Sequence, residues 1–133
     1  MEIDKPAIDI GIITRAPEAM MAFYHELLGL PLDATIPMPG GGTMRRLKVG
    51  ESVVKIIDTD PEPPTDAVPG GIRAATGYRY WTIHISGLSD ALLAIEQAGH
   101  KVLLGPKSIR DGITIAMVED PDGNWVELLE RTA

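Results

Sequence analysis

The spacing of apolar residues changes from a strand-like to a helical period early in the chain. Residues 7–13 are nearly all apolar apart from one aspartate and one glycine, which predicts a strand. A helix is predicted next, because apolar residues recur with the i, i+3, i+4, i+7, i+8 spacing of a helix packed by one face: Met20, Phe23, Tyr24, Leu27 and Leu28. Gly29 then favours the end of this helix.

Three further strands are predicted before the middle of the chain. Residues 31–37 form the first, and residues 44–49 and 52–58 form a hairpin that turns at Gly50 and Glu51. The predicted order of this first segment is therefore strand, helix and three strands.

The second half of the chain repeats this order. Residues 78–85 are predicted to form a strand, and Ser86 or Ser89 is a candidate cap for the helix that follows. The helix is indicated by apolar residues at helical spacing, namely Leu88, Ala91, Leu92 and Ile95. Gly99 favours its end.

The chain ends with three more predicted strands. A short one covers residues 101–104, and a hairpin of residues 113–118 and 125–129 turns through Asp-Pro-Asp-Gly-Asn. Residues 53–58 read Val-Val-Lys-Ile-Ile-Asp and residues 125–130 read Trp-Val-Glu-Leu-Leu-Glu, so Lys55 corresponds to Glu127. Two copies of one supersecondary unit are predicted.

Residues 59–77 separate the two copies. This segment is rich in proline and glycine, which disfavours a regular element, and loops of this length are often functional. It is either a lid that excludes water from a site or a solvated linker.

Composition and charge exclude several classes of function. The 133 residues include no cysteine, so disulfides, thiolate metal sites and cysteine nucleophiles are absent. A net charge of −7 disfavours nucleic acid as a partner. No apolar run is long enough to span a membrane and the N-terminus lacks the pattern of a signal peptide, so we expect a cytoplasmic protein.

Two motifs resemble the vicinal oxygen chelate superfamily, which includes glyoxalase I, bleomycin-resistance proteins, methylmalonyl-CoA epimerase and extradiol dioxygenases. Residues 22–30 read Ala-Phe-Tyr-His-Glu-Leu-Leu-Gly-Leu, similar to a family signature near the first helix. Residues 118–129 read Val-Glu-Asp-Pro-Asp-Gly-Asn-Trp-Val-Glu-Leu-Leu, similar to the family's last hairpin.

The resemblance implies an α+β fold in one domain, residues 1–133. Two tandem βαβββ modules, residues 1–58 and 78–133, would form a curled mixed sheet, or cup, with helices on the outside. A small-molecule ligand would bind on the floor of the cup. Members often form homodimers, so a homodimer is expected.

Metal-dependent members place four ligands on the floor, usually His or Gln, Glu or Gln, His, and Glu. The resemblance puts Asp9, Lys55, Tyr80 and Glu127 at these positions, of which only Glu127 fits the pattern. A lysine ammonium about 4 Å from a divalent metal would repel it by roughly 8 kcal/mol at an effective dielectric near 20. We therefore predict no metal cofactor. If the alignment of the ligands is wrong, a divalent metal and a glyoxalase-like or epimerase-like activity become the alternative.

The first functional hypothesis is a metal-independent isomerase or lyase acting on a carbonyl compound. Glu127 would be the general base, Lys55 would stabilise the enolate-like anion, and Tyr80 would donate a hydrogen bond to its oxygen. Asp9 would orient Lys55 and keep it charged. The alternative for these four residues is a structural network of ion pairs.

The second hypothesis is a protein that sequesters a small molecule, as bleomycin-resistance proteins do. Trp125 lies two residues before Glu127, so both face the same side of their strand, and Trp125 is a candidate for contact with a ligand. Thr82 and His84 share the face of Tyr80, although His84 is also explained as a core histidine. Arg46 and Arg73 are candidates for an anionic group, or else ordinary surface arginines.

Overall fold

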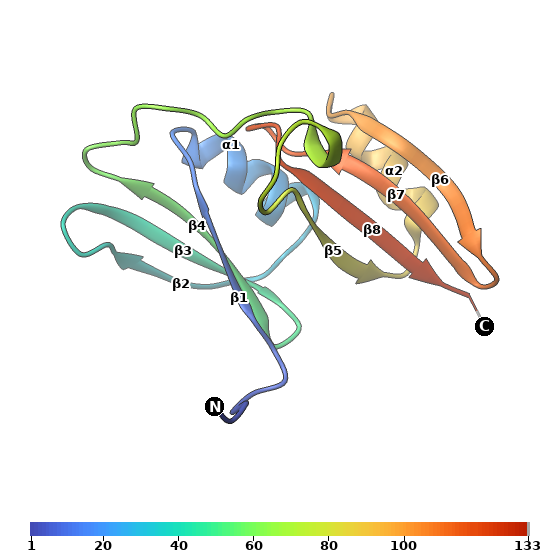
Figure 1. Ribbon diagram of the computed structural model, residues 1–133, viewed down its shortest axis with the longest axis horizontal. Helices are drawn as coiled ribbons and strands as arrows, with labels where there is room; N and C mark the ends of the chain where they lie inside the picture. The colour runs from blue at the N-terminus through green and yellow to red at the C-terminus, as the bar shows by residue number, and fades with distance from the viewer. Residues whose placement is uncertain (133) are drawn as a thin grey trace. The chain divides into compact units, whose positions relative to one another are not determined.

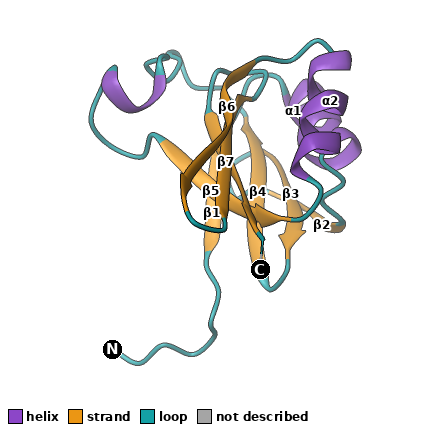
Figure 2. Ribbon diagram, turned by 90° about the vertical axis from the view of Figure 1, so that its right-hand side faces the viewer, coloured by secondary structure: helices purple, strands orange, loops and turns teal. Residues whose placement is uncertain are grey.

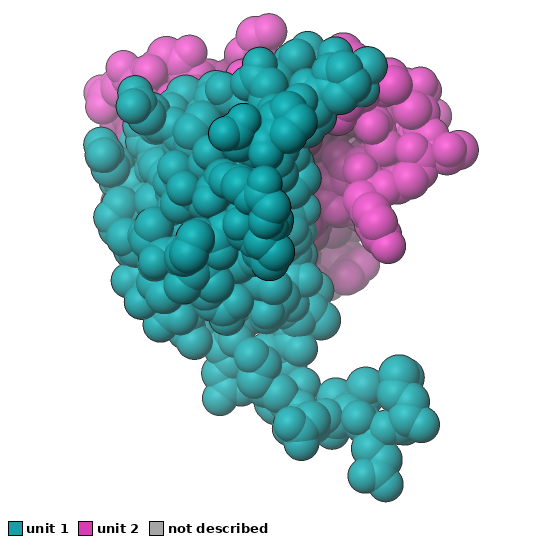
Figure 3. Space-filling view, turned by 90° about the vertical axis from the view of Figure 1, so that its left-hand side faces the viewer, with its two compact units in different colours: residues 1–66 teal, residues 67–133 magenta. Residues whose placement is uncertain are grey.

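The computed structural model describes residues 1–132. The chain divides into two compact units, which Figure 3 colours separately. Unit 1 comprises Met1–Asp66 and unit 2 begins at Ala67. The division falls inside the proline-rich segment that separates the two predicted repeats.

Unit 1 contains one mixed four-stranded sheet, with strands ordered β1-β4-β3-β2 (Figure 1). β1 runs parallel to β4, and the other neighbours are antiparallel. The elements follow along the chain as β1 (Asp9–Ile13), α1 (Pro17–Met21), the π-helix η1 (Ala22–Leu27), β2 (Leu32–Pro37), β3 (Gly42–Val49) and β4 (Ser52–Thr59). The predicted strand, helix and three strands are confirmed, with the helix changing to a π-helix at Ala22.

The core of unit 1 lies between its helical segment and one face of its sheet. α1 contacts β4. The largest fully buried side chains of unit 1 come from the helical stripe and from alternating positions of β3 and β4: Met20, Phe23, Tyr24, Leu47, Val54 and Ile56. The rings of Phe23 and Tyr24 meet edge to face with centroids 4.9 Å apart. The opposite face of the sheet carries Lys55, which is therefore directed away from the helices.

Unit 2 repeats this topology, with strands ordered β5-β8-β7-β6 and β5 parallel to β8. A 3₁₀ helix, η2 (Gly71–Arg73), interrupts the long loop before β5 (Figure 2). The remaining elements are β5 (Tyr80–Ile85), α2 (Leu88–Gln97), β6 (Val102–Arg110), β7 (Ile113–Glu119) and β8 (Trp125–Arg131). The predicted fold class, α+β with two βαβββ modules, is confirmed.

The start of α2 differs from the sequence prediction. Its N-cap is Gly87, in the left-handed conformation at φ 75°, and neither Ser86 nor Ser89 caps the helix. Instead, the Glu130 carboxylate accepts a hydrogen bond from the backbone N–H of Leu88 at 3.0 Å. A negative charge at a helix N-terminus also interacts favourably with the helix dipole. The cap comes from a residue 42 positions away, which local sequence patterns do not reveal.

β6 extends well beyond the predicted residues 101–104. Its pairing with β7 shifts register at three places, and Gly105-Pro106 lies within the irregular part. Gly105 has φ +95°, and a Cβ there would lie 2.5 Å from the Ile115 carbonyl oxygen. Glycine and proline in a strand mark such bulges, and here they interrupted the alternation that predicts a strand.

Unit 2 packs α2 against β6 and β8. The buried faces of α2, β7 and β8 form its core, with Leu88, Leu92, Ile95, Val118, Val126 and Leu128 among the most deeply buried. In residues 1–132 no helix is long and apolar enough to cross a membrane.

Candidate functional site

Lys55 and Asp9 form an ion pair on the helix-free face of the unit 1 sheet. Their strands, β4 and β1, are neighbours, and the Lys55 ammonium lies 3.4 Å from the Asp9 carboxylate. Both side chains are partly solvent-accessible, 26% for Lys55 and 34% for Asp9. The sequence prediction that Asp9 neighbours Lys55 agrees with this geometry.

Arg46 lies next to Lys55 on the same face, because the two residues are directly paired between β3 and β4. Its guanidinium lies 3.8 Å from the Asp9 carboxylate and 3.6 Å from the Asp33 carboxylate. Asp9 is thus shared by two cations. This cluster of two positive and two negative side chains is the main electrostatic feature of that face.

Arg45 behaves differently from its neighbour in sequence. It points to the opposite face and donates a hydrogen bond to Asp58 at 2.7 Å. Arg45 is therefore hydrogen-bonded within the fold, whereas the ion pairs of Arg46 with Asp9 and Asp33 are longer.

Glu127 occupies the position in unit 2 that Lys55 occupies in unit 1. It pairs with Thr82 on β5 and with Met117 on β7. The Thr82 hydroxyl donates a hydrogen bond of 2.8 Å to Glu127 Oε1. This bond fixes one carboxylate oxygen and leaves Oε2 available as a proton acceptor.

Tyr80 and His84 flank Thr82 on β5, two residues away on either side. Tyr80 pairs with Trp125 and is 48% exposed, so Thr82 and not Tyr80 contacts the carboxylate of Glu127. His84 is exposed and pairs with Leu129. The interpretation of His84 as a core histidine is therefore wrong, because the edge of β5 leaves its side chain in solvent.

Trp125 is covered within unit 2 by the loop that precedes β5. Gly71 lies against the indole so closely that a Cβ on it would come within 2.2 Å of ring carbons. The indole Nε1 of Trp125 is buried, and no described residue accepts its hydrogen bond. Arg79 fixes the loop by donating hydrogen bonds to the carbonyl oxygens of Gly71 at 2.8 Å and Val68 at 2.6 Å.

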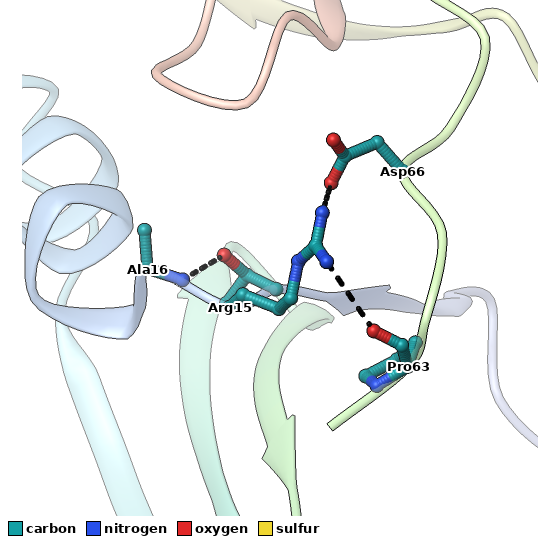
Figure 4. Close-up of polar contacts among 5 residues, drawn as sticks. Arg15, Ala16, Pro63 and Asp66 are labelled. Atoms are coloured by element: carbon teal, nitrogen blue, oxygen red, sulfur yellow. Dashed lines mark hydrogen bonds and ion pairs between the residues drawn. The ribbon is translucent and has the colours of Figure 1, made fainter.

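The part of the loop that belongs to unit 1 is held by another arginine. Arg15, which follows β1, forms an ion pair with Asp66 and donates a hydrogen bond to the Pro63 carbonyl oxygen at 3.5 Å (Figure 4). Each half of the loop is thus attached to its own unit by a guanidinium that contacts the main chain. Arg73, at the end of η2, is exposed to solvent.

The turn between β7 and β8 is organised by Asp120, which is only 3% exposed. Its carboxylate accepts hydrogen bonds at 2.9 Å from the backbone N–H groups of Asp122 and Asn124 and from the Asn124 side chain. This part of the Asp-Pro-Asp-Gly-Asn motif therefore stabilises the hairpin that ends in Trp125 and Glu127.

Within each unit, the side chains around Asp9, Lys55 and Glu127 do not match the ligands that a divalent metal prefers. In unit 1, the carboxylate of Asp9 is already adjacent to the Lys55 ammonium, whose positive charge repels a cation. In unit 2, Glu127 neighbours a hydroxyl and a thioether rather than imidazoles. Residues 1–132 contain no group of three or more His, Asp or Glu side chains arranged to hold a metal.

Three residues with clear structural roles were missed by sequence reasoning. Arg79 holds the loop, Gly71 permits its close approach to Trp125, and Gly11 pairs with Lys55 and leaves open space beside it. Of these three residues, only Gly11 could have been noticed in the sequence, because a glycine within an otherwise apolar strand often marks a close approach of another group.

Comparison with known proteins agrees with the repeated topology. A family model described as Glyoxalase/Bleomycin resistance protein/Dioxygenase superfamily matches residues 8–128. No curated protein matches the chain.

Solved structures with the same fold include proteins described in different ways. A glyoxalase family protein from Bacillus cereus matches with a TM-score of 0.86 and 13% identity, covering 100% of this chain and 97% of that one. TnmS3, an antibiotic binding protein from Streptomyces sp. CB03234, matches with a TM-score of 0.70 and 21% identity over 99% of each chain. A glyoxalase family protein from Enterococcus faecalis has a TM-score of 0.66 and 24% identity over 97% of each chain. At these identities the likeness establishes the fold alone.

Proposed function

This chain belongs to the Glyoxalase/Bleomycin resistance protein/Dioxygenase superfamily, and we propose that it is an isomerase or lyase that acts on a carbonyl compound without a metal. The observation that carries the proposal is the Lys55 ammonium, 3.4 Å from Asp9, at a position where metal-dependent members are expected to have a ligand. The reaction class is removal of a proton next to a carbonyl group and stabilisation of the resulting enolate.

Lys55 is assigned the stabilisation of negative charge on the substrate oxygen. A fixed ammonium favours an anion most when it is held in place before the reaction and partly shielded from water. Asp9 and Arg46 neighbour Lys55, and its side chain is only 26% exposed. Asp9 keeps the ammonium in place and offsets the repulsion from Arg46.

Glu127 is assigned the role of general base. One of its carboxylate oxygens accepts the hydrogen bond from Thr82, which restricts rotation of the side chain. The other oxygen is free to accept a proton from the carbon next to the carbonyl. Such a base contributes about 10²–10⁴-fold to a reaction rate when it is within hydrogen-bond reach of the proton.

Solvent deuterium exchange tests the proposal even before the substrate is known. Small 2-oxo acids, ketones and aldehydes are incubated with the protein in D₂O, and loss of the proton next to the carbonyl is followed by NMR. We expect exchange above the uncatalysed rate for at least one compound, with Glu127→Gln abolishing it. Glu96→Gln, an exposed position on α2, is the matched control and should exchange normally. Equal rates for wild type and Glu127→Gln would refute the assignment of the base.

Sequestration of a small molecule is the second candidate function. It is supported by the likeness in fold to TnmS3, an antibiotic binding protein. Against it, Gly71 covers part of the Trp125 indole and reduces the aromatic surface on which a ligand could stack. A compound that binds tightly and is recovered without deuterium or any other change would favour sequestration over catalysis.

We also propose that the protein is a homodimer, as the sequence resemblance implies. Light scattering after size-exclusion chromatography should give twice the chain mass of 14.3 kDa, and the mass of one chain would refute the dimer.

A further inference from the structure

We propose that Lys55 and Arg46 together form a subsite for a small 2-oxo acid with an apolar chain. The inference rests on the proposed function in that it names the class of substrate for Lys55. It depends, however, on the arrangement of side chains on the helix-free face of the unit 1 sheet, and binding alone can test it.

Four residues form a row across this face. The strand pairing places Gly11 beside Lys55, Lys55 beside Arg46, and Arg46 beside Ala34. Side chains of directly paired residues have Cβ atoms about 5 Å apart, so the ammonium and the guanidinium can contact neighbouring groups of one ligand.

Lys55 and Arg46 are ion-paired with carboxylates but donate no hydrogen bond of ordinary length to the described residues. Their contacts with Asp9 and Asp33 measure 3.4–3.8 Å, which exceeds the usual length of a hydrogen bond. Within residues 1–132 neither cation makes a hydrogen bond, in contrast to Arg45 with its 2.7 Å bond to Asp58. An ammonium has three N–H donors and a guanidinium has five, so both can bind anionic oxygens.

The ends of the row leave room for a ligand. Ala34 carries only a methyl group, and Gly11 carries no side chain at all. A Cβ placed on Gly11 would have only the Ile57 Cδ1 within 4 Å, at 3.9 Å. The space beside Lys55 is therefore open, and the φ of Gly11 is not in the left-handed region that would require glycine.

The chemistry of the two cations indicates the ligand class. A guanidinium presents parallel donors that match a carboxylate, whereas an ammonium is a compact charge that suits a single oxygen. A carboxylate with a carbonyl oxygen on the next carbon presents both groups side by side. This arrangement is that of a 2-oxo acid.

The neighbouring row favours an apolar chain on that acid. Strand pairing places one apolar residue on each strand, two positions from the cation row: Ile13, Ile57, Met44 and Ile36. Ile13 and Ile36 at the ends of this row are 48% and 40% exposed. Burial of a branched alkyl group against them adds about 25 cal/mol for each Å² removed from water.

The test is calorimetric titration of 4-methyl-2-oxopentanoate into the protein. We expect saturable binding that weakens by about tenfold or more in Arg46→Gln, because a charge-assisted hydrogen bond is lost. Arg45→Gln is the matched control, since Arg45 is adjacent in sequence, carries the same charge and faces the other side of the sheet. It should bind within twofold of wild type, which separates the subsite from the general loss of one positive charge.

Two further comparisons test the ligand class and the open space. The primary amide of the same acid should bind far more weakly, and so should pyruvate, which lacks the branched chain. Gly11→Val should fill the space beside Lys55 and weaken binding while β1 remains folded, because valine is favourable in strands.

Equal affinity of the acid for wild type and Arg46→Gln would overturn the inference, and so would equal affinity of wild type for the acid and its amide. Absence of binding by the acid would overturn it as well. Deuterium exchange on other carbonyl compounds would then still support the proposed function. Conversely, binding of the acid without deuterium exchange on any carbonyl compound would support the subsite and refute the proposed enzymatic activity.

Discussion

The hydroxyl of Thr82 donates a 2.8 Å hydrogen bond to Glu127 across the parallel pair of β5 and β8. In the other repeat the corresponding pair is Gly11 and Lys55. One fold position thus has a carboxylate oriented by a hydroxyl in one unit and an ammonium beside an open space in the other. Lys55 and Glu127 therefore occupy equivalent positions but carry opposite charges. We assign them different roles for this reason: Lys55 stabilises an anion and Glu127 accepts a proton.

Loss of the Thr82 hydroxyl should slow catalysis without unfolding the protein. Thr82→Val keeps the shape and the strand preference of the side chain but removes the donor to Glu127. A hydrogen bond to a charged group contributes about 1.5–3 kcal/mol, so the exchange rate should fall about tenfold or more. Thr82→Ser restores the donor and should recover most of the rate. An unchanged rate in Thr82→Val would show that Glu127 needs no such orientation.

Removal of the Glu130 carboxylate should destabilise unit 2, because this carboxylate accepts a hydrogen bond from the backbone N–H of Leu88 at the start of α2. Glu130→Ala is expected to lower the free energy of unfolding by about 1 kcal/mol, the usual loss for a helix cap. Urea denaturation measures the change. Ser89→Ala is the control, since Ser89 does not cap the helix, and it should alter stability by less than about 0.5 kcal/mol. A larger loss in Ser89→Ala than in Glu130→Ala would contradict the observed cap.

A side chain on Gly71 should displace the loop from Trp125. Gly71→Ala adds a Cβ that overlaps the indole ring and also places alanine at φ +64°. Gly99→Ala at φ +87°, with nothing within 4 Å, reproduces the backbone strain without the overlap. Gly99→Ala should cost about 1–2 kcal/mol of stability, and Gly71→Ala should cost about 1–3 kcal/mol more. Tryptophan emission should shift to the red only in Gly71→Ala, and equal spectra for the two variants would contradict the close contact.

Substitution of Asp120 should weaken the last hairpin strongly. Its buried carboxylate accepts three hydrogen bonds, and Asp120→Ala should lower the free energy of unfolding by about 3 kcal/mol or more. Asp122→Ala is the control, because Asp122 is exposed and contributes only its backbone N–H to this turn. Thermal unfolding followed by circular dichroism measures both. Similar losses for the two variants would argue against the role of Asp120.

The repeated topology was predictable because each element depends on a regular local pattern. The stripe from Met20 to Leu28 specifies the buried face of the first helix, and the similarity of residues 53–58 to 125–130 specifies two equivalent strands. The full length of β6 was not predictable, because Gly105 and Pro106 interrupt its alternation. The cap of α2 was missed for a different reason, since it comes from Glu130 on the last strand.

The candidate site was predictable only in part. The resemblance to the superfamily placed Asp9 and Lys55 on the same floor, and strand parity placed Thr82 on the same face as Tyr80. It could not distinguish which of these two β5 residues contacts Glu127, because that depends on the register of β5 against β8. The hydrogen bonds of Arg79 and Arg15 to loop carbonyls depend on tertiary contacts that have no sequence pattern.

Deuterium exchange in the presence of a metal chelator distinguishes Lys55 from a bound metal as the group that stabilises the anion. In the proposed reaction the Lys55 ammonium, and not a bound metal, stabilises the anion formed when the substrate loses its proton. We expect EDTA to leave the exchange rate of the wild-type protein unchanged and Lys55→Met to abolish exchange while the protein remains folded. Loss of exchange with EDTA and its recovery on addition of zinc, nickel, manganese or iron would contradict this role of Lys55.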